Sequence, residues 1–262
     1  MRVRSTALLA PRAFGCAVFR PQRAARIAIG FWPGVLTALG SLGIGLVAAF
    51  GATLIGIVAG ILVLGSVPST EPGHLVTGSA ELVFYAAGGW FAWVILRRQR
   101  PGALRPLRRS EGRVMLIGLG ALLVIRVATA AGLLLTGQSG HVQSGFENFD
   151  VVSTVPAVTA LAVALAALTM VVAGPVVEEI VFRGLLFGAL ARPLGVLGAA
   201  LISAALFAGV HGDPVLFPTL AALGFVCALS YAATGNLAVP IVLHAANNVL
   251  GTLVLIAGSF AR

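Results

Sequence analysis

The stretch from Ala157 to Gly184 has the sequence AVTALAVALAALTMVVAGPVVEEIVFRG, and it decides the fold class. Its first part, up to Val177, contains no charged residue. That part supplies the roughly 20 apolar residues that a helix needs to cross the hydrocarbon core of a bilayer. Two glutamates and an arginine then follow among apolar neighbours. The stretch therefore predicts a membrane-spanning helix that carries charge.

The rest of the chain has the same character. Of its 262 residues 59% are hydrophobic and only 10% are charged, whereas charged residues make up about 25% of soluble domains. The apolar residues form long runs instead of alternating segments, which excludes an outer-membrane barrel as well as a soluble enzyme. We predict an all-α, polytopic membrane helical bundle of about seven transmembrane helices, with an eighth possible because the first run is very long. The apolar runs are Ile27–Leu64, Glu81–Leu96, Val114–Leu135, Val151–Val177, Val196–Val210, Val215–Ala233 and Leu237–Ala257.

The positive charge is a topology signal. All 17 basic residues are arginine, and most lie in two clusters, at 2–26 and 97–113, beside apolar runs. The positive-inside rule places both clusters in the cytoplasm, so we predict an integral protein of a bacterial plasma membrane with a cytoplasmic N terminus and no nucleic-acid partner. Ser66–Ser79 and Gly137–Asp150, which contain no arginine, are the predicted outer loops. Arg12 interrupts the short apolar stretch near the N terminus, which argues against a cleaved signal peptide.

This pattern divides the chain into three parts. Residues 1–26 form a basic cytoplasmic N-terminal arm, residues 27–150 form N-terminal transmembrane helices with about three spans, and residues 151–262 form a C-terminal core. Charged groups inside apolar segments cost at least about 2.5–3.5 kcal/mol at a helix centre and are functional candidates by default. The core contains most of these candidates.

The first motif is Glu178, Glu179 and Arg183. At 3.6 residues per turn, Glu179 and Arg183 lie about 40° apart on one helix face, which predicts an ion pair. Glu178 points elsewhere and is left free to act. The alternative is a charge cluster that merely closes the helix at the membrane interface.

The second motif is Phe207 and His211, one turn apart on a helix. Pro193 and Gly195 predict a turn between the fourth and fifth spans. Measured from Leu194, Glu178 lies 194 − 178 = 16 residues before the turn and His211 lies 211 − 194 = 17 residues after it. In an antiparallel hairpin these two side chains would lie at the same depth. The alternative for a single histidine at a helix end is a capping or interfacial residue.

The third motif is His244 and Asn248, four residues apart on the last span, with Asn247 beside them as a supporting candidate. His244 and Asn248 lie about 12 Å and 18 Å from the inner turn at 1.5 Å per residue, against about 24 Å for Glu178. They can therefore share one cavity with it, although polar residues that merely join two helices are the alternative. Arg126 is expected either to pair with an acid such as Glu178 or Glu179 or to extend its charged end toward the membrane interface.

These side chains suggest hydrolysis. A buried Glu178 beside His211 can take a proton from water, and His244 and Asn248 can donate hydrogen bonds to an oxyanion. Equally, Glu178, His211 and His244 are acceptable ligands for a tetrahedral Zn²⁺ that keeps a fourth position for water. No serine, cysteine or threonine is paired with a base, so a covalent nucleophile is not predicted.

Together the three motifs carry a resemblance. E-E-x-x-x-R, F-x-x-x-H and H-x-x-x-N follow in this order over 248 − 178 = 70 positions. In this respect the segment from Val151 to Ala257 resembles the CAAX protease and bacteriocin-processing (CPBP) family of intramembrane endopeptidases. The resemblance implies that residues 151–262 are a peptidase core, with Glu178 and His211 activating water, His244 and Asn248 stabilising the oxyanion, and a peptide or protein substrate within the bilayer. Metal dependence is disputed in that family, so zinc and metal-free chemistry both stay open.

Two other functions compete with an intramembrane peptidase. A small-molecule transporter would show internal repeats, which the sequence lacks. A catalytically silent scaffold or immunity protein on the same fold would typically have lost a motif residue, and none is lost here. Eukaryotic members of the family process prenylated proteins, but the resemblance does not carry a prenylated substrate over. Asp213 is expected to be a turn residue or to orient His211, and His74 and His141 have no predicted role.

Overall fold

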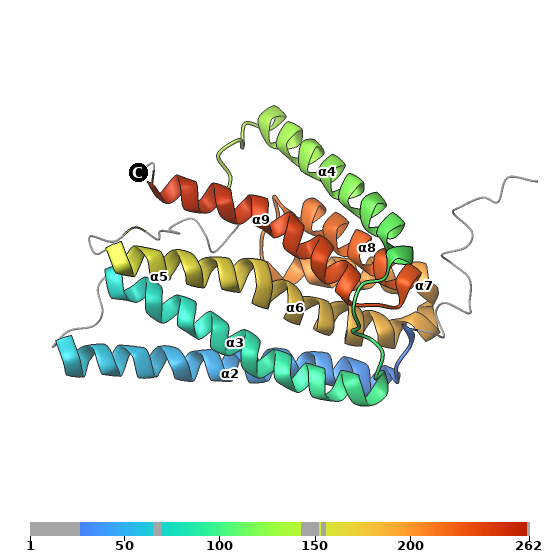
Figure 1. Ribbon diagram of the computed structural model, residues 1–262, viewed down its shortest axis with the longest axis horizontal. Coiled ribbons are helices and arrows are strands. Elements are labelled where there is room, and N and C mark those ends of the chain that lie inside the picture. The colour runs from blue at the N-terminus through green and yellow to red at the C-terminus, as the bar shows by residue number, and fades with distance from the viewer. Residues whose placement is uncertain (1–26, 65–69, 143–151, 153–155, 261–262) are drawn as a thin grey trace, which may run out of the picture.

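A computed structural model describes residues 27–64, 70–142, 152 and 156–260 of the chain. Within these residues every regular element is helical (Figure 1), which confirms the predicted all-α, polytopic bundle. The α-helices are α2 (Phe31–Leu64), α3 (Thr70–Gln99), α4 (Gly112–Leu135), α5 (Pro156–Ala167), α6 (Gly174–Glu179), α7 (Gly188–Val210), α8 (Phe217–Thr234) and α9 (Ala238–Phe260). The other elements are the 3₁₀ turn η1 (Arg109–Glu111) and the π-helical segments η2 (Leu168–Ala173) and η3 (Ile180–Phe187).

Six helical stretches of the described residues are long and apolar enough to cross a membrane. One of them, Pro156–Val210, has 55 residues and would extend about 80 Å at 1.5 Å per residue, more than twice a bilayer core of about 30 Å. It reverses direction at Gly195, whose φ of 69° and ψ of 174° are not helical. Because this stretch is long enough to cross twice, the six stretches agree closely with the predicted seven crossings. In the described part of the chain the first apolar run does not divide into two spans, because α2 is one continuous helix of 34 residues.

The turn at Gly195 builds the hairpin that the sequence predicts. Its positive φ is tolerated by glycine because no Cβ clashes there. Beyond the turn, Ser203 Oγ donates a hydrogen bond of 2.9 Å to the carbonyl of Phe182. The rings of Phe182 and Phe207 pack edge to face at 5.3 Å. Counted away from the turn, Glu178 lies four residues from Phe182 and His211 lies four residues from Phe207. Because the two phenylalanines pack together, Glu178 and His211 lie at about the same level of the hairpin.

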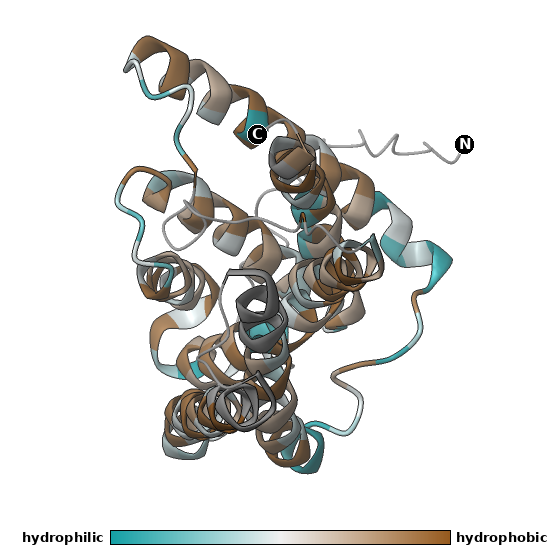
Figure 2. Cartoon of the chain, turned by 90° about the vertical axis from the view of Figure 1, so that its left-hand side faces the viewer, coloured by the Kyte–Doolittle hydropathy of each residue, from teal (hydrophilic) through white to brown (hydrophobic). Residues whose placement is uncertain are grey.

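The helices form a bundle in which α4 leans away from the rest (Figure 1). The helices α2 and α3 pack together on one side, and the continuous rod from α5 through η3 lies between them and α9. The helix α4 packs mainly against α8 and α9. Figure 2 shows that the helices are mostly hydrophobic and that hydrophilic residues concentrate in loops and at helix ends.

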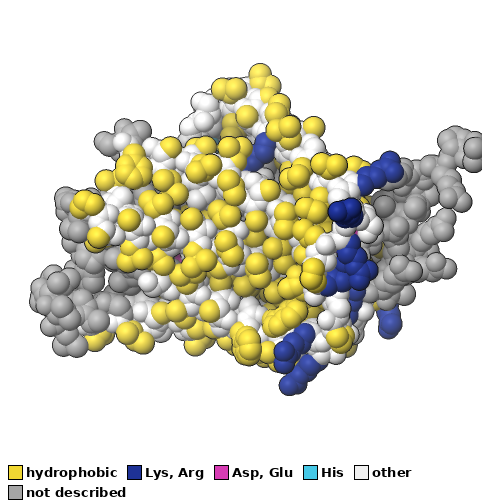
Figure 3. Space-filling view, viewed as in Figure 1, with side chains coloured by type: hydrophobic (Ala, Val, Ile, Leu, Met, Phe, Trp, Pro, Cys, Tyr) yellow, Lys and Arg dark blue, Asp and Glu magenta, His cyan; other side chains and the backbone are white. Residues whose placement is uncertain are grey.

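The surface agrees with a position in the membrane. Large apolar side chains such as Val47, Phe50, Ile55 and Leu135 are more than two-thirds exposed. Figure 3 shows a mainly hydrophobic face with arginine side chains gathered at one end of the molecule, where the loop between α3 and α4 lies. Exposed apolar side chains of this size are typical of a lipid-facing surface, so the protein is an integral membrane protein.

Two segment boundaries differ from the prediction. The helix α3 begins at Thr70, so most of the predicted outer loop Ser66–Ser79 is helical. A helix satisfies its own backbone hydrogen bonds and can therefore extend beyond its apolar part. The fourth helix does not end at Val177 but continues through Arg183, so the acidic motif lies inside a helical rod and does not close one. The N-terminal arm 1–26 and most of the loop Gly137–Asp150 lie outside the described residues.

The contact between α2 and α3 depends on Gly88. A Cβ atom added at Gly88 would lie 2.5 Å from the backbone oxygen of Ser41, a contact that only a shift of the two helices can relieve. We expect Gly88→Ala to destabilise the protein by about 1–3 kcal/mol through overpacking. Gly43→Ala is the matched control, because open space surrounds Gly43. Thermal unfolding in detergent tests this, and equal midpoints for both variants would contradict the close packing.

Candidate active site

A break in regular helix geometry prepares the site. In the π-helical turn of η2 the N–H of Gly174 bonds to the carbonyl of Thr169, five residues back. The carbonyl of Met170 would take the next such bond from Pro175, which has no N–H. This carbonyl instead accepts a hydrogen bond of 3.0 Å from Asn248 Nδ2 on α9. The Gly174-Pro175 pair therefore supplies a backbone acceptor in the interior of the bundle.

The predicted ion pair of Glu179 and Arg183 is formed and is completely buried. Arg183 Nη1 lies 3.0 Å from Glu179 Oε1, and both side chains are 0% exposed. The N–H groups of Arg183 make no hydrogen bond within the described residues, so the two groups attract as charges without an aligned N–H···O bond. The guanidinium lies 4.6 Å above the Phe207 ring. On the α8 side Gly224 leaves room for it, since a Cβ atom there would lie 3.0 Å from Nη2.

His244 lies between the two glutamates. Its Nδ1 is 2.9 Å from Glu179 Oε1, and its Nε2 is 3.8 Å from Glu178 Oε2. Because an ionised carboxylate only accepts hydrogen bonds, Nδ1 is the donor to Glu179. His244 is 2% exposed, so its ring is held by these contacts in a fixed orientation. Glu179 therefore orients a ring whose other nitrogen faces Glu178.

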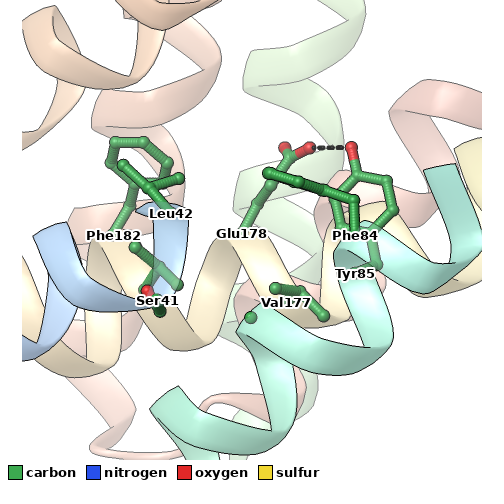
Figure 4. A pocket seen from close by; sticks show the side chains of 9 residues that line it. Ser41, Leu42, Phe84, Tyr85, Val177, Glu178 and Phe182 are labelled. Carbon is green, nitrogen blue, oxygen red and sulfur yellow. Dashed lines mark hydrogen bonds between the residues drawn. The ribbon is translucent and has the colours of Figure 1, made fainter. Parts of the chain in front are cut away.

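Glu178 is the accessible carboxylate of the pair. Its side chain is 19% exposed, against 0% for Glu179. Tyr85 on α3 donates a hydrogen bond of 2.9 Å to Glu178 Oε1 (Figure 4). A cavity of about 20 Å³, lined mainly by apolar groups, adjoins the two side chains.

Tyr85 is the residue that sequence reasoning missed. It lies in the second apolar run, where a tyrosine between Phe84 and Ala86 resembles a packing residue. Only the packing of α3 against α6 brings its hydroxyl to Glu178. A polar side chain inside an apolar run was the one available signal.

His211 joins the site through an aromatic ring. Its Nδ1 lies 2.7 Å from the carbonyl of Phe207, which can only accept, so Nδ1 donates and Nε2 keeps its lone pair in the neutral ring. The rings of Phe207 and His211 are 4.7 Å apart, and those of Phe207 and His244 are 5.5 Å apart. Within the described residues, His211 makes no direct hydrogen bond with Glu178. The buried Phe207 ring therefore separates the two histidines and fixes their spacing.

The polar residues of α9 continue as a chain. Asn247 Nδ2 donates to Asn248 Oδ1 at 3.1 Å, as expected for a supporting residue. Arg126 Nε donates to Asn247 Oδ1 at 3.0 Å, and Arg126 Nη2 donates to the Asn247 carbonyl at 2.7 Å. The expected pairing of Arg126 with an acid is therefore wrong. In its place, the side-chain oxygen and the backbone carbonyl of Asn247 on α9 accept its hydrogen bonds.

Asp213 forms the turn after α7, as expected. Its Oδ1 accepts hydrogen bonds of 2.9 Å from the N–H groups of Val215 and Leu216. His141, which the sequence left without a partner, lies 2.9 Å from Asp213 Oδ2. This contact joins the segment after α4 to the turn that follows His211.

The zinc hypothesis needs Glu178, His211 and His244 around one ion. In the described part of the chain no three histidine, cysteine, aspartate or glutamate side chains gather closely enough to hold a metal. The Phe207 contacts explain this, because they space His211 from His244. The donor set does not fit a zinc ion in this arrangement, and no step below depends on one.

The fold and the site thus define a polytopic membrane protein with a buried, polar, glutamate-centred site. Residues 160–250, about a third of the 262-residue chain, match the family described as Type II CAAX prenyl endopeptidase Rce1-like. The motif-bearing part of the chain is therefore related to the CAAX proteases, and the resemblance predicted from the three motifs is confirmed.

Two bacterial relatives are also similar. YdiL of Bacillus subtilis (strain 168), provisionally named a membrane peptidase, is 40% identical over 83 residues, which are 32% of this chain and 34% of YdiL. MroQ of Staphylococcus aureus (strain USA300), named a membrane-embedded CAAX protease, is 36% identical over 81 residues, which are 29% of this chain and 33% of MroQ. The match thus spans about a third of the length of each relative. No solved structure matches the chain significantly.

The Glu179–Arg183 pair yields a prediction about stability. Glu179→Gln keeps the shape of the side chain but leaves the Arg183 charge buried without its counter-charge, so we expect a loss of about 3–5 kcal/mol. The double variant Glu179→Gln with Arg183→Met removes both charges and should recover much of that loss. Membrane abundance and thermal unfolding in detergent measure both. A double variant as unstable as Glu179→Gln would show that charge neutralisation is not what holds this pair.

Proposed function

We propose that the protein is an intramembrane endopeptidase in which Glu178 activates a water molecule to hydrolyse a peptide bond. One observation carries the proposal: of two adjacent glutamates, Glu179 is neutralised by Arg183, whereas Glu178 is accessible and faces Nε2 of His244. An accessible carboxylate in an apolar site is a suitable general base. The likeness of residues 160–250 to CAAX endopeptidases supports the same chemistry.

The reaction follows from these positions. Glu178 removes a proton from water as the water oxygen attacks the carbonyl carbon of the peptide, and the carbonyl oxygen becomes an oxyanion. The proton then passes to the leaving nitrogen, and the C–N bond breaks to give a carboxylic acid and an amine. His244 Nε2, 3.8 Å from Glu178 Oε2, lies on a path for this proton. His211, whose Nε2 keeps its lone pair, assists by accepting a hydrogen bond from the water or the substrate.

The oxyanion needs donors. Asn248 uses one of its two Nδ2–H bonds on the Met170 carbonyl and has the second one for the substrate. His244 can donate through Nε2 once it holds a second proton, because Nδ1 already donates to Glu179. Donors fixed before the reaction stabilise developing charge more than mobile ones do.

The remaining features concern the membrane. The peptidase core is residues 151–262, and the N-terminal helices complete it by supplying Tyr85. The substrate is a peptide or protein segment that reaches the site within the bilayer of a bacterial plasma membrane. The N terminus lies in the cytoplasm, since the arginine-rich loop between α3 and α4 marks the inner side.

Cleavage of a quenched fluorescent peptide library by the purified protein, reconstituted in liposomes, tests the proposal. We expect Glu178→Gln and His211→Ala to lose activity by about 100-fold or more while the proteins remain in the membrane. Wild-type activity in Glu178→Gln would defeat the proposal. Addition of a chelator tests the zinc hypothesis in the same assay, because activity that persists without metal needs only the side chains named here.

Tyr85 gives a finer prediction. Tyr85→Phe removes only the hydrogen bond to Glu178 Oε1, so we expect kcat to fall by about ten-fold, the effect of losing one charge-assisted hydrogen bond of about 1.5 kcal/mol. Thermal unfolding should change little, because the ring that fills the space is kept. The kinetic constants of this variant, beside those of Phe84→Leu as a neighbouring packing control, measure the effect. Unchanged kcat would assign Tyr85 to packing alone.

A further inference from the structure

A relay of hydrogen bonds leads from α4 to the proposed oxyanion donor. Arg126 Nε donates to Asn247 Oδ1 at 3.0 Å, and Asn247 Nδ2 donates to Asn248 Oδ1 at 3.1 Å. Asn248 Nδ2 then donates to the carbonyl of Met170 at 3.0 Å. The relay joins three separate segments of the chain, α4, α9 and η2, through hydrogen bonds that are partly buried.

The two ends of the relay fix its direction. An arginine side chain only donates hydrogen bonds, and a backbone carbonyl only accepts them. Asn247 must therefore turn its oxygen toward Arg126 and its NH₂ group toward Asn248. In turn, Asn248 presents its oxygen to Asn247 and its NH₂ group to Met170. With Arg126 in place, a joint turn of the two amides by about 180° would lose the hydrogen bonds at both ends of the relay, whereas without Arg126 it would lose only the bond to Met170.

This direction matters for catalysis. A turned Asn248 amide would present its oxygen, an acceptor, where a donor to the oxyanion is needed. We propose that Arg126 is a positioning residue that holds the Asn248 amide in its donating orientation through Asn247. The inference rests on the proposed peptidase function and deepens it by adding a residue outside the three motifs.

The position of Arg126 agrees with such a role. A charged residue in the middle of a membrane helix costs several kcal/mol and is kept where it has a task. Arg126 Nη2 donates a second hydrogen bond, of 2.7 Å, to the backbone carbonyl of Asn247. The guanidinium therefore binds both the backbone and the side chain of one residue.

Steady-state cleavage kinetics of reconstituted variants test the proposal. We expect Arg126→Met to lower kcat by about ten- to hundred-fold, the usual effect of removing a residue that orients a catalytic group, with KM changed less than about two-fold. Asn247→Asp should have a similar effect, because it keeps the acceptor for Arg126 but loses the donor to Asn248. Arg126→Lys should recover part of the rate. Thr129→Val is the matched control on α4, since Thr129 contacts Thr219 on α8 and takes no part in the relay.

Combination with Asn248→Ala separates this inference from the proposed function. Once Asn248 is removed, Arg126→Met should lower kcat no further, because nothing is left to position. Wild-type kcat in Arg126→Met beside an inactive Asn248→Ala would overturn the role of Arg126 alone. Full activity in Asn248→Ala would defeat the oxyanion assignment, and the positioning role with it. If Arg126→Met fails to accumulate in the membrane, Asn247→Asp decides, since it leaves the Arg126 contact in place.

Discussion

The buried carboxylate of Glu179 is the group on which the site depends. It pairs with Arg183 at 3.0 Å and accepts the Nδ1–H of His244 at 2.9 Å, all away from solvent. An isolated charge in such surroundings would be very costly, so each of the two charged groups depends on the other being present. Glu179 thereby fixes two side chains on two helices at once. The ring orientation of His244, the stacking of Arg183 on Phe207 and the freedom of Glu178 all follow from this contact.

The helices are adapted to polar groups in two ways. A small residue makes room, as Gly224 does for Arg183. Irregular helix turns supply backbone acceptors, as the π-helical turn before Pro175 does for Asn248. Irregular backbone at membrane depth is tolerated only where protein groups satisfy it. Such π-helical turns occur frequently at functional sites, and here two of them flank the two glutamates.

The sequence predicts some of these features well and others poorly, for physical reasons. Apolar run length predicts membrane helices because the bilayer sets a fixed thickness. Helical spacing predicts the Glu179–Arg183 pair, and nearly equal distances from Leu194 predict the common depth of Glu178 and His211. Contacts between helices that are distant in sequence were beyond reach, because rotation about a helix axis is set by packing. Tyr85 and the partner of Arg126 are two examples, and the π-helical turns are a third, since hydrophobic pattern does not reveal them.

Glu179 is the structural carboxylate of the site, and we propose that Glu178 is the catalytic one. The thermal unfolding midpoint of Glu178→Gln tests this division directly, because the amide oxygen of the substituted side chain could still accept the Tyr85 hydrogen bond and only the charge would be lost. The account predicts a midpoint equal to or above that of the wild type, since residues kept for function often cost stability. A large fall, of the size expected for removing the buried charge of Glu179, would show that Glu178 is also a structural carboxylate and would contradict the account.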